Sequence, residues 1–161
     1  MHCVLVLHNI RSVHNVGSIF RTADAAGVSK IVLSGYTPAP VDRFGRARKD
    51  FAKVSLGAEK TMPWEHVAQL TPALKRLKED GYKLIAVEQD KKSISLFEYA
   101  KQHKSASRRI ALVLGNEVSG LPKSILAQAD TIIEIPMRGK KESLNVSVAA
   151  GVALFVIRGA S

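Results

Sequence analysis

The sequence is poor in cysteine, in acidic residues and in long apolar runs, and each shortage excludes a class of protein. Cys3 is the single cysteine, so no internal disulfide can form, and its place in the apolar run CVLVL favours a buried thiol over a nucleophile. One cysteine and five histidines without metal-like spacing do not make a zinc site. We therefore expect a protein of a reducing compartment, with no disulfide and no bound metal.

Apolar runs of membrane length are also missing. No run approaches the roughly 18 residues that read as a membrane-spanning helix. The opening MHCVLVLHNIRS has neither a charged leader nor a small-residue cleavage site. These absences predict a cytoplasmic protein without a membrane partner. With 161 residues and no repeat, low-complexity tract or linker, the chain is expected to form one domain over residues 1–161.

Acidic residues are outnumbered, since 24 Lys and Arg stand against 14 Asp and Glu and give a formal net charge of +10. Such an excess predicts a polyanionic partner, with a nucleic acid first among them. The cations form three clusters: Arg43, Arg46, Arg48, Lys49 and Lys53; Lys101, Lys104, Arg108 and Arg109; and Arg138, Lys140 and Lys141. The first cluster also holds Phe44 and Phe51, and basic and aromatic side chains together suit a flexible single strand. The alternative is a solvated surface that only keeps the protein soluble.

Short apolar runs alternate with helical patterns along the chain. Strands are predicted at residues 3–8, 30–35, 83–88, 109–115 and 131–135. Helices are predicted at residues 15–28, 64–81, 95–103, 122–129 and 142–158. Asn15 is the predicted cap of the first helix, and Pro72 is predicted to break the second. This alternation indicates an α/β fold, a Rossmann-like parallel sheet covered by helices on both faces.

Two segments stand out from this pattern. Residues 36–60 carry two prolines and weak periodicity, so we interpret them as an exposed excursion with room for one helical turn or a short strand. The last helix is apolar nearly all the way round, which predicts that it is buried. Its first turn is the exception, because Glu142, Ser143 and Asn145 bring hydrogen-bonding groups to it. They mark either a site or a simple helix cap.

Polar loops follow the first, fourth and fifth predicted strands, at the end of a parallel sheet where ligands bind. The loop GNEVSGLP has glycines at positions 115 and 120, but Leu121 and Pro122 stand where a triphosphate-binding loop needs Lys and Ser or Thr. The sequence also has no GxGxxG after the first strand and no GxSxG. Taken alone, Glu117 is compatible with a solvated loop acid, and Arg21 with a surface arginine.

Three motifs together resemble the SpoU (TrmH) family of the SPOUT superfamily. They are Asn15-x-Gly17-x-x-x-Arg21, LVLGNEVSGL over residues 112–121 and IPMRGKKESLNVSVAAG over residues 135–151. The resemblance implies an S-adenosylmethionine-dependent methyltransferase that acts on an RNA ribose 2′-hydroxyl. It also implies a C-terminal trefoil knot, which periodicity could not show, and a homodimer that builds each active site. The chain is similar to the minimal branch with only a catalytic domain, for which tRNA is the first expected substrate and rRNA the second.

The same resemblance implies roles for individual residues. Arg21 would be the catalytic arginine and Asn15 its supporting partner. The catalytic set is completed by Glu117, Ser143 and Asn145. The cofactor set would be Gly115, Ile135, Met137, Ser143 and Leu144. The expected RNA contacts are the cations Arg43, Arg46, Arg48, Lys49, Arg138, Lys140 and Lys141.

The chemistry of Arg21 stays open at this point. A guanidinium is normally protonated and cannot serve as a base, so either its pKa is strongly depressed or it stabilises negative charge while another group takes the proton. A noncatalytic RNA-binding protein that keeps the fold is the alternative function. A methyltransferase acting on a base or a protein is a third, and the ribose-modifying motifs disfavour it.

Overall fold

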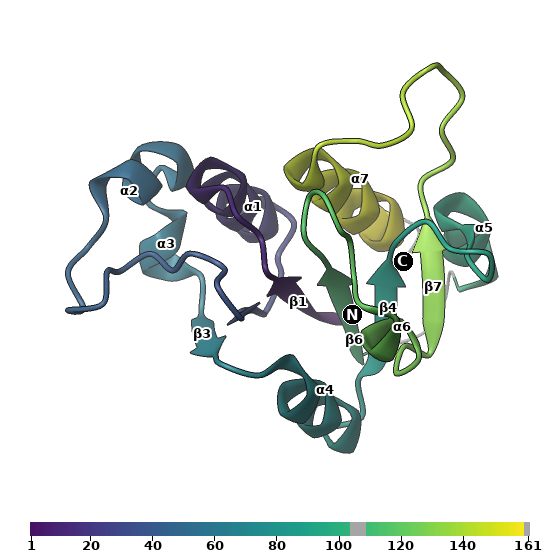
Figure 1. Cartoon of the computed structure of the whole chain (residues 1–161), viewed down its shortest axis with the longest axis horizontal. Coiled ribbons are helices and arrows are strands. Elements are labelled where there is room, and N and C mark those ends of the chain that lie inside the picture. Colours follow the sequence, from purple (N-terminus) through teal and green to yellow (C-terminus); the bar gives the residue numbers. More distant parts are fainter. Residues whose placement is uncertain (104–108, 160–161) are drawn as a thin grey trace.

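The computed structural model describes residues 1–103 and 109–159, which form a seven-stranded parallel sheet in the order β3-β2-β1-β6-β4-β7-β5 (Figure 1). The strands are β1 His2–His8, β2 Lys30–Ser34, β3 Trp64–Val67, β4 Lys83–Val87, β5 Ile94–Ser95, β6 Arg109–Leu114 and β7 Thr131–Glu134. The helices are α1 Val13–Ala25, α2 Lys49–Ser55, α3 Ala58–Thr61, α4 Leu70–Glu79, α5 Leu96–Gln102, α6 Lys123–Leu126 and α7 Val146–Gly159. The predicted α/β class and parallel sheet are confirmed, whereas the knot stays a prediction. Lys104 and Arg108 of the second cationic cluster lie outside the described residues.

Helices cover both faces of the sheet because successive strand residues point to opposite sides. In β1, Leu5 and Leu7 join the core beneath α1, α2, α3, α5 and α7, and Val4 and Val6 join the core beneath α4 and α6. Every one of these β1 side chains is buried. A strand that is apolar on both faces belongs in the middle of a covered parallel sheet, which is where β1 lies.

Cys3 lies in this core and is fully buried, as its sequence context predicts. Burial raises the pKa of its thiol to about 12, although the positive charge of Arg158 acts in the opposite direction. A thiol in this state is not a nucleophile at neutral pH. Over the part of the chain that the structure describes, no helix is long and apolar enough to cross a membrane.

Five predicted strands are confirmed, but the stretch from Trp64 to Gly81 is not one broken helix. It begins with the edge strand β3, and α4 starts only at Leu70. Pro72 does not break α4 because it lies in the first turn, where the backbone N–H groups have no partner within the helix. The two-residue strand β5 was also missed, since it is too short to show an alternation.

The excursion of residues 36–60 is more ordered than its composition predicts. It contains α2 and α3, and Phe51 of α2 is fully buried with its ring 5.1 Å from that of Phe20 in α1. Phe51 therefore contributes to the core and not to a nucleic-acid surface. A Cβ atom at Gly17 would lie 3.1 Å from Cβ of Val54 and 3.3 Å from the carbonyl oxygen of Phe51. The glycine of the first motif thus allows close packing of α1 against α2.

Two helix starts differ from the predictions. Helix α1 begins at Val13, and its cap is Ser12, whose hydroxyl accepts a hydrogen bond from the backbone N–H of Asn15 at 3.2 Å. The side chain of Asn15 is therefore not used as a cap. Helix α7 begins at Val146, so Glu142, Ser143 and Asn145 precede the helix and do not form its first turn.

The outer face of α7 also contradicts the predicted burial on all sides. The side chains of Val148 and Phe155 are 49% and 55% exposed in the single chain. They share one face with Gly151, because residues three and four apart on a helix are neighbours. An apolar face of this kind fits a surface that a partner covers.

Candidate active site

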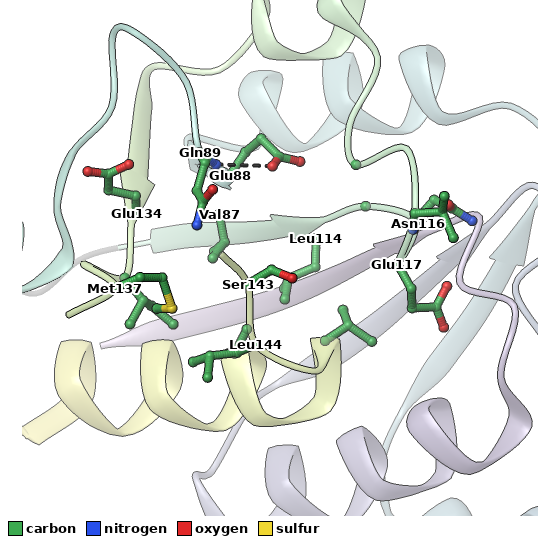
Figure 2. Close-up of a pocket in the computed structure, with 16 residues that line it drawn as sticks. Val87, Glu88, Gln89, Leu114, Asn116, Glu117, Glu134, Met137, Ser143 and Leu144 are labelled. Carbon is green, nitrogen blue, oxygen red and sulfur yellow. Dashed lines mark hydrogen bonds between the residues drawn. The ribbon is translucent and has the colours of Figure 1, made fainter. Parts of the chain in front are cut away.

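A pocket of about 220 Å³ lies at the carboxyl ends of β4, β6 and β7, where Val87, Leu114 and Glu134 reach its wall (Figure 2). The structure brings together in its lining every residue of the predicted cofactor set: Gly115, Ile135, Met137, Ser143 and Leu144. These residues come from two loops that are distant in sequence, after β6 and after β7. The loop after β7 also carries the cations at 138–141 and projects beyond the sheet before it returns to α7 (Figure 1).

The loop after β6 is held in a fixed shape by backbone packing. A Cβ atom at Gly115 would lie 2.6 Å from the carbonyl carbon of Gly120 and 2.7 Å from the nitrogen of Leu121. Gly120 has a φ of +66°, and a Cβ there would meet the carboxylate of Glu88. Both glycines are therefore required by the turn itself, and not by a phosphate ligand.

Glu88 and Gln89 were not among the predicted site residues, yet they connect the two loops to β4. The carboxylate of Glu88 accepts a hydrogen bond from the backbone N–H of Leu121 at 2.9 Å. The amide of Gln89 donates to the carbonyl oxygen of Glu142 at 2.6 Å. Both side chains line the pocket (Figure 2). The signal that could have found them is their position at the end of the predicted strand 83–88, with Glu88 as its last residue and Gln89 as the first residue after it.

A polar network lies at one end of the pocket and joins three members of the predicted catalytic set. The side-chain amide of Asn15 donates to Glu117 at 3.1 Å, and the amide of Asn145 donates to the oxygen of Asn15 at 3.1 Å. Glu117 lines the pocket at the end opposite Met137 (Figure 2). The network thus brings together α1, the loop after β6 and the loop before α7.

Glu117 is held in its ionised form. Desolvation is the largest single effect on its pKa and would raise it. Hydrogen bonds from the backbone N–H groups of Arg11, Glu117 itself and Ser12 and from the Asn15 amide outweigh that effect, so the pKa of Glu117 lies below its ordinary value. A carboxylate with a lowered pKa is a weak proton acceptor at neutral pH. Glu117 is therefore suited to orient Asn15 and the loops, and not to act as general base.

We expect Glu117→Gln to lower the stability of the protein at neutral pH. Because the folded-state pKa is depressed, the ionised carboxylate stabilises the fold above its unfolded-state pKa, and this contribution is lost as pH falls through the folded-state pKa. The difference in unfolding free energy between wild type and variant should stay constant from pH 7 to about pH 5 and should shrink as pH falls below the unfolded-state pKa of about 4.3, as measured by urea unfolding down to about pH 3. Glu98→Gln, at an exposed position of α5, is the matched control. A difference that stays constant with pH would contradict the hydrogen-bonded carboxylate.

The two remaining members of the catalytic set are placed differently. Ser143 lines the pocket, but it is not hydrogen-bonded to the polar network within the described residues. Arg21 is exposed on α1 and does not line the pocket, and its side chain makes no hydrogen bond or ion pair with any residue in the ranges 1–103 and 109–159. A single chain therefore does not bring Arg21 to the other polar residues.

The predicted RNA contacts lie in two segments that differ in how many of their cations form ion pairs with acidic side chains. In the turn after Val41, Arg43 and Arg46 lie over the ring of Phe44 at 4.7 and 5.0 Å, and Arg46 is also paired with Asp42 at 2.7 Å. Arg48 forms two hydrogen bonds with Asp50, at 3.1 and 2.8 Å. In contrast, no ion pair within the described residues involves the exposed Lys49 or the cations Arg138, Lys140 and Lys141.

Comparison with known proteins identifies the family. The sequence model of the SpoU rRNA methylase family matches residues 2–155. The chain belongs to this family. It is 38% identical over 152 residues to the 23S rRNA (guanosine-2′-O-)-methyltransferase RlmB of Ralstonia nicotianae. The aligned region covers 94% of this chain and 56% of the relative. This SpoU family chain thus spans about half the length of the curated relatives it matches.

Solved structures of family members share the fold. The AdoMet-bound rRNA methyltransferase from Sinorhizobium meliloti superposes with a TM-score of 0.83 at 28% identity, covering 98% of this chain and 56% of that one. A structure described as giving insights into the 2-OH methylation of C/U34 on tRNA superposes with a TM-score of 0.79 at 26% identity, covering 97% of this chain and 93% of that one. The parallel sheet is therefore the sheet of the SpoU family, and the motifs at residues 112–121 and 135–151 supply most of the pocket lining. Among the described residues, no three His, Cys, Asp or Glu side chains come close enough to hold a metal ion.

Proposed function

We propose that this protein is an S-adenosylmethionine-dependent RNA methyltransferase that modifies a ribose 2′-hydroxyl. The observation that carries the proposal is the pocket itself, which gathers the predicted cofactor residues and ends at the Asn15, Glu117 and Asn145 network. Family membership supports the reaction, and so does the AdoMet-bound relative from Sinorhizobium meliloti. We also propose that residues 1–161 form one methyltransferase domain.

The lining of the pocket fits S-adenosylmethionine chemically. Ile135, Met137 and Leu144 offer apolar walls that suit a purine ring, and Gly115 lines the pocket beside them. Glu88, Gln89 and Glu117 place acidic and amide oxygens in the same lining, which suits a ligand with positively charged ammonium and sulfonium groups. When bound, the cofactor supplies an electrophilic methyl group on a sulfonium.

The protein's own task is to position a ribose 2′-oxygen and to manage its proton. Methyl transfer to that oxygen would require that the negative charge developing on it be stabilised and that its proton pass to solvent water. Glu117 is a poor acceptor for that proton, because its hydrogen bonds lower its pKa. We assign it the positioning of Asn15, and we assign Arg21 the stabilisation of the charge that develops on the oxygen.

Arg21 does not line the pocket of its own chain, so we propose that a second copy of the chain supplies it. On α7, a Cβ atom at Gly151 would lie 3.5 Å from the methyl group of Thr22, so the Arg21 region of α1 borders the exposed apolar face of Val148 and Phe155. We propose a homodimer that covers this face and brings Arg21 of one protomer to the pocket of its partner. The absence of Arg21 from the pocket lining of its own chain supports this arrangement.

The choice of RNA is a finer question. The sequence alone ranks tRNA ahead of rRNA, but the named RlmB relatives act on 23S rRNA, which supports rRNA first. The structure concerned with C/U34 on tRNA has a chain of nearly the same length as this one, which keeps tRNA as the second candidate.

One assay tests the function and the substrate together. The protein is incubated with methyl-labelled S-adenosylmethionine and, separately, with unmodified 23S rRNA and total tRNA, and the labelled nucleotide is then mapped. Label at a site that resists alkaline cleavage identifies a 2′-O-methyl group, because alkali cleaves RNA through a free 2′-hydroxyl. Cofactor binding without any transfer to either RNA would favour the noncatalytic RNA-binding protein. The intact set of Arg21, Glu117, Ser143 and Asn145 favours the enzyme, since RNA binding alone does not require it.

The basic segment after Val41 provides a prediction about RNA affinity. Neutralising Arg43 and Lys49 together, as Arg43→Gln and Lys49→Gln, should reduce the slope of log affinity against log salt by roughly 1.4 to 1.8, since each lost phosphate contact removes about 0.7 to 0.9. Both side chains are exposed and neither forms an ion pair within the described residues.

Arg48→Gln is the matched control for this salt series. Its guanidinium is already paired with Asp50, which raises the pKa of Arg48 and leaves less of its charge for a phosphate. We expect a smaller change of slope for this variant, measured with the RNA that accepts methyl groups. An unchanged slope in the double variant would place the RNA elsewhere, along Arg138, Lys140 and Lys141.

A further inference from the structure

Tyr36 is an exposed aromatic residue whose position is fixed beside the pocket. Its side chain is 59% exposed although it follows directly after the buried strand β2. Its hydroxyl oxygen accepts a hydrogen bond from the side-chain amide of Asn116 at 2.9 Å, and Asn116 lines the pocket. Tyr36 itself is not part of the lining, so its ring lies outside the cofactor space and at its rim.

The backbone around Tyr36 is held from both sides. The side-chain oxygen of Asn9 accepts a hydrogen bond from the backbone N–H of Tyr36 at 3.2 Å. Gly35 has a φ of +64°, and a Cβ atom there would meet the Asn9 side chain. The buried hydroxyl of Thr37 donates toward the carbonyl oxygens of Ser34 and Leu7, at 2.8 and 3.1 Å, and accepts from the N–H of Ile10. The turn is therefore tied to the end of β1 as well as to β2.

The same contacts connect Tyr36 to the polar network. Asn116 is the neighbour of Glu117 in the chain, and its amide also donates to the carbonyl oxygen of Asn9 at 2.8 Å. One side of this dipeptide thus holds the Tyr36 ring, and the other side holds the Asn15 and Glu117 pair. Two consecutive residues therefore connect the Tyr36 hydroxyl to the Asn15 and Glu117 pair.

We propose that Tyr36 is the stacking platform for the base of the RNA nucleotide that is methylated. This inference rests on the proposed function, which places the ribose at the end of the pocket formed by Glu117. A ribose held there projects its base outward past Asn116, and the exposed ring of Tyr36 is the aromatic surface at that rim. The hydroxyl anchor fixes the ring in advance, so that stacking costs little loss of side-chain freedom.

The partner is an unpaired base. A base within a duplex is already stacked on its neighbours and cannot offer its face to a side chain, whereas loops and bulges present bases that stack on aromatic residues. Stacking on Tyr36 tolerates any base, since each has a π-face. The substrate is therefore expected to carry its target nucleotide in a loop, a bulge or a single-stranded segment.

Two variants of Tyr36 separate the ring from the hydroxyl. Tyr36→Leu keeps an apolar side chain without an aromatic face, and it should weaken the binding of a fluorescein-labelled, mixed-sequence single-stranded RNA oligonucleotide by about tenfold, measured with S-adenosylhomocysteine present. Tyr36→Phe keeps the ring and should stay within about threefold of wild type. Phe97→Leu removes another exposed aromatic side chain, on α5 and outside the pocket lining, and should change nothing. The same oligonucleotide in a duplex should bind the Leu variant and the wild type equally.

The kinetics of methyl transfer provide a second measurement of the role of Tyr36. With the RNA that wild type methylates, Tyr36→Leu should raise KM by about the same factor, while its cofactor affinity and melting temperature match those of Tyr36→Phe, which loses the same hydrogen bond to Asn116. Equal single-strand affinity in wild type and Tyr36→Leu, or an equal loss in Tyr36→Phe, would overturn the platform. Absence of methyl transfer by the wild type itself would overturn the proposed reaction instead, and the oligonucleotide binding would still decide the role of Tyr36.

Discussion

Replacing Arg21 with alanine is expected to lower methyl transfer by about 10²–10³-fold, the usual effect of removing one group that stabilises charge in a transition state. The affinity for S-adenosylmethionine should stay within a few-fold of wild type, because Arg21 does not line the pocket of its own chain. Stability should hardly change, since the side chain is exposed and has no ion pair among the described residues. Single-turnover transfer to the methylated RNA and calorimetry with the cofactor measure the two effects separately.

Mixing two inactive variants tests whether Arg21 acts across a dimer. In a hybrid of an Arg21→Ala protomer and a Gly115→Ala protomer, one site combines the intact pocket of the first with the intact Arg21 of the second. If Arg21 acts on the partner's pocket, randomly exchanged dimers should recover about a quarter of the wild-type activity. If it acts within its own chain, every site in the hybrid lacks one component and no activity returns. Wild-type transfer by Arg21→Ala alone would remove Arg21 from the catalytic set.

Much of the sheet was predictable because local pattern and tertiary environment agree. Strands β1 and β6 are continuous apolar runs, as central strands covered on both faces must be. The short edge strands β3 and β5 have no such pattern, and β5 has only two residues. Their strand conformation depends on pairing with β2 and β7. These partners are distant in sequence, so a local sequence pattern does not reveal the pairing.

The site was predictable in its members but not in its assembly. The motifs named Asn15, Glu117 and Asn145, yet only the fold shows that Asn15 bonds to both of the others. Glu88 and Gln89 were missed because their function comes from contacts with Leu121 and Glu142, which lie 33 and 53 residues away in the chain. Hydrogen bonds over such separations leave no periodic signal in the sequence.

Composition was the least reliable guide to individual roles. Phe44 and Phe51 stand in the same basic stretch, but the first is 65% exposed and the second is fully buried. The difference arises because Phe51 belongs to α2, which packs on Phe20 of α1, whereas Phe44 lies in a turn organised by Asp42. The apolar sequence of α7 misled in the opposite direction, because it predicted burial on all sides, whereas Val148 and Phe155 are about half exposed in the single chain.

The substitution Gly115→Ala is expected to abolish measurable binding of S-adenosylmethionine. The added Cβ would lie 2.6 to 2.7 Å from three backbone atoms of Gly120 and Leu121, and backbone atoms cannot rotate away as a side chain can. The loop after β6 must therefore shift, which separates the N–H of Leu121 from Glu88 and moves Asn116 in the pocket wall. Displacements of about 1 Å in such a site can cost 10²-fold in function. Overpacking of this kind also destabilises a fold by about 1–3 kcal/mol.

Gly139→Ala is the matched control for this effect. A Cβ atom there meets nothing within 4 Å, so the same chemical change is made in the other loop of the site without a clash. Calorimetric titration with the cofactor, together with thermal unfolding in its presence and absence, should show binding and stabilisation for wild type and Gly139→Ala and neither for Gly115→Ala. If Gly115→Ala is folded and binds the cofactor as tightly as wild type, the cofactor occupies another part of the molecule. The Asn15, Glu117 and Asn145 network would then need a different explanation, because its proposed role depends on a methyl donor in the adjacent pocket.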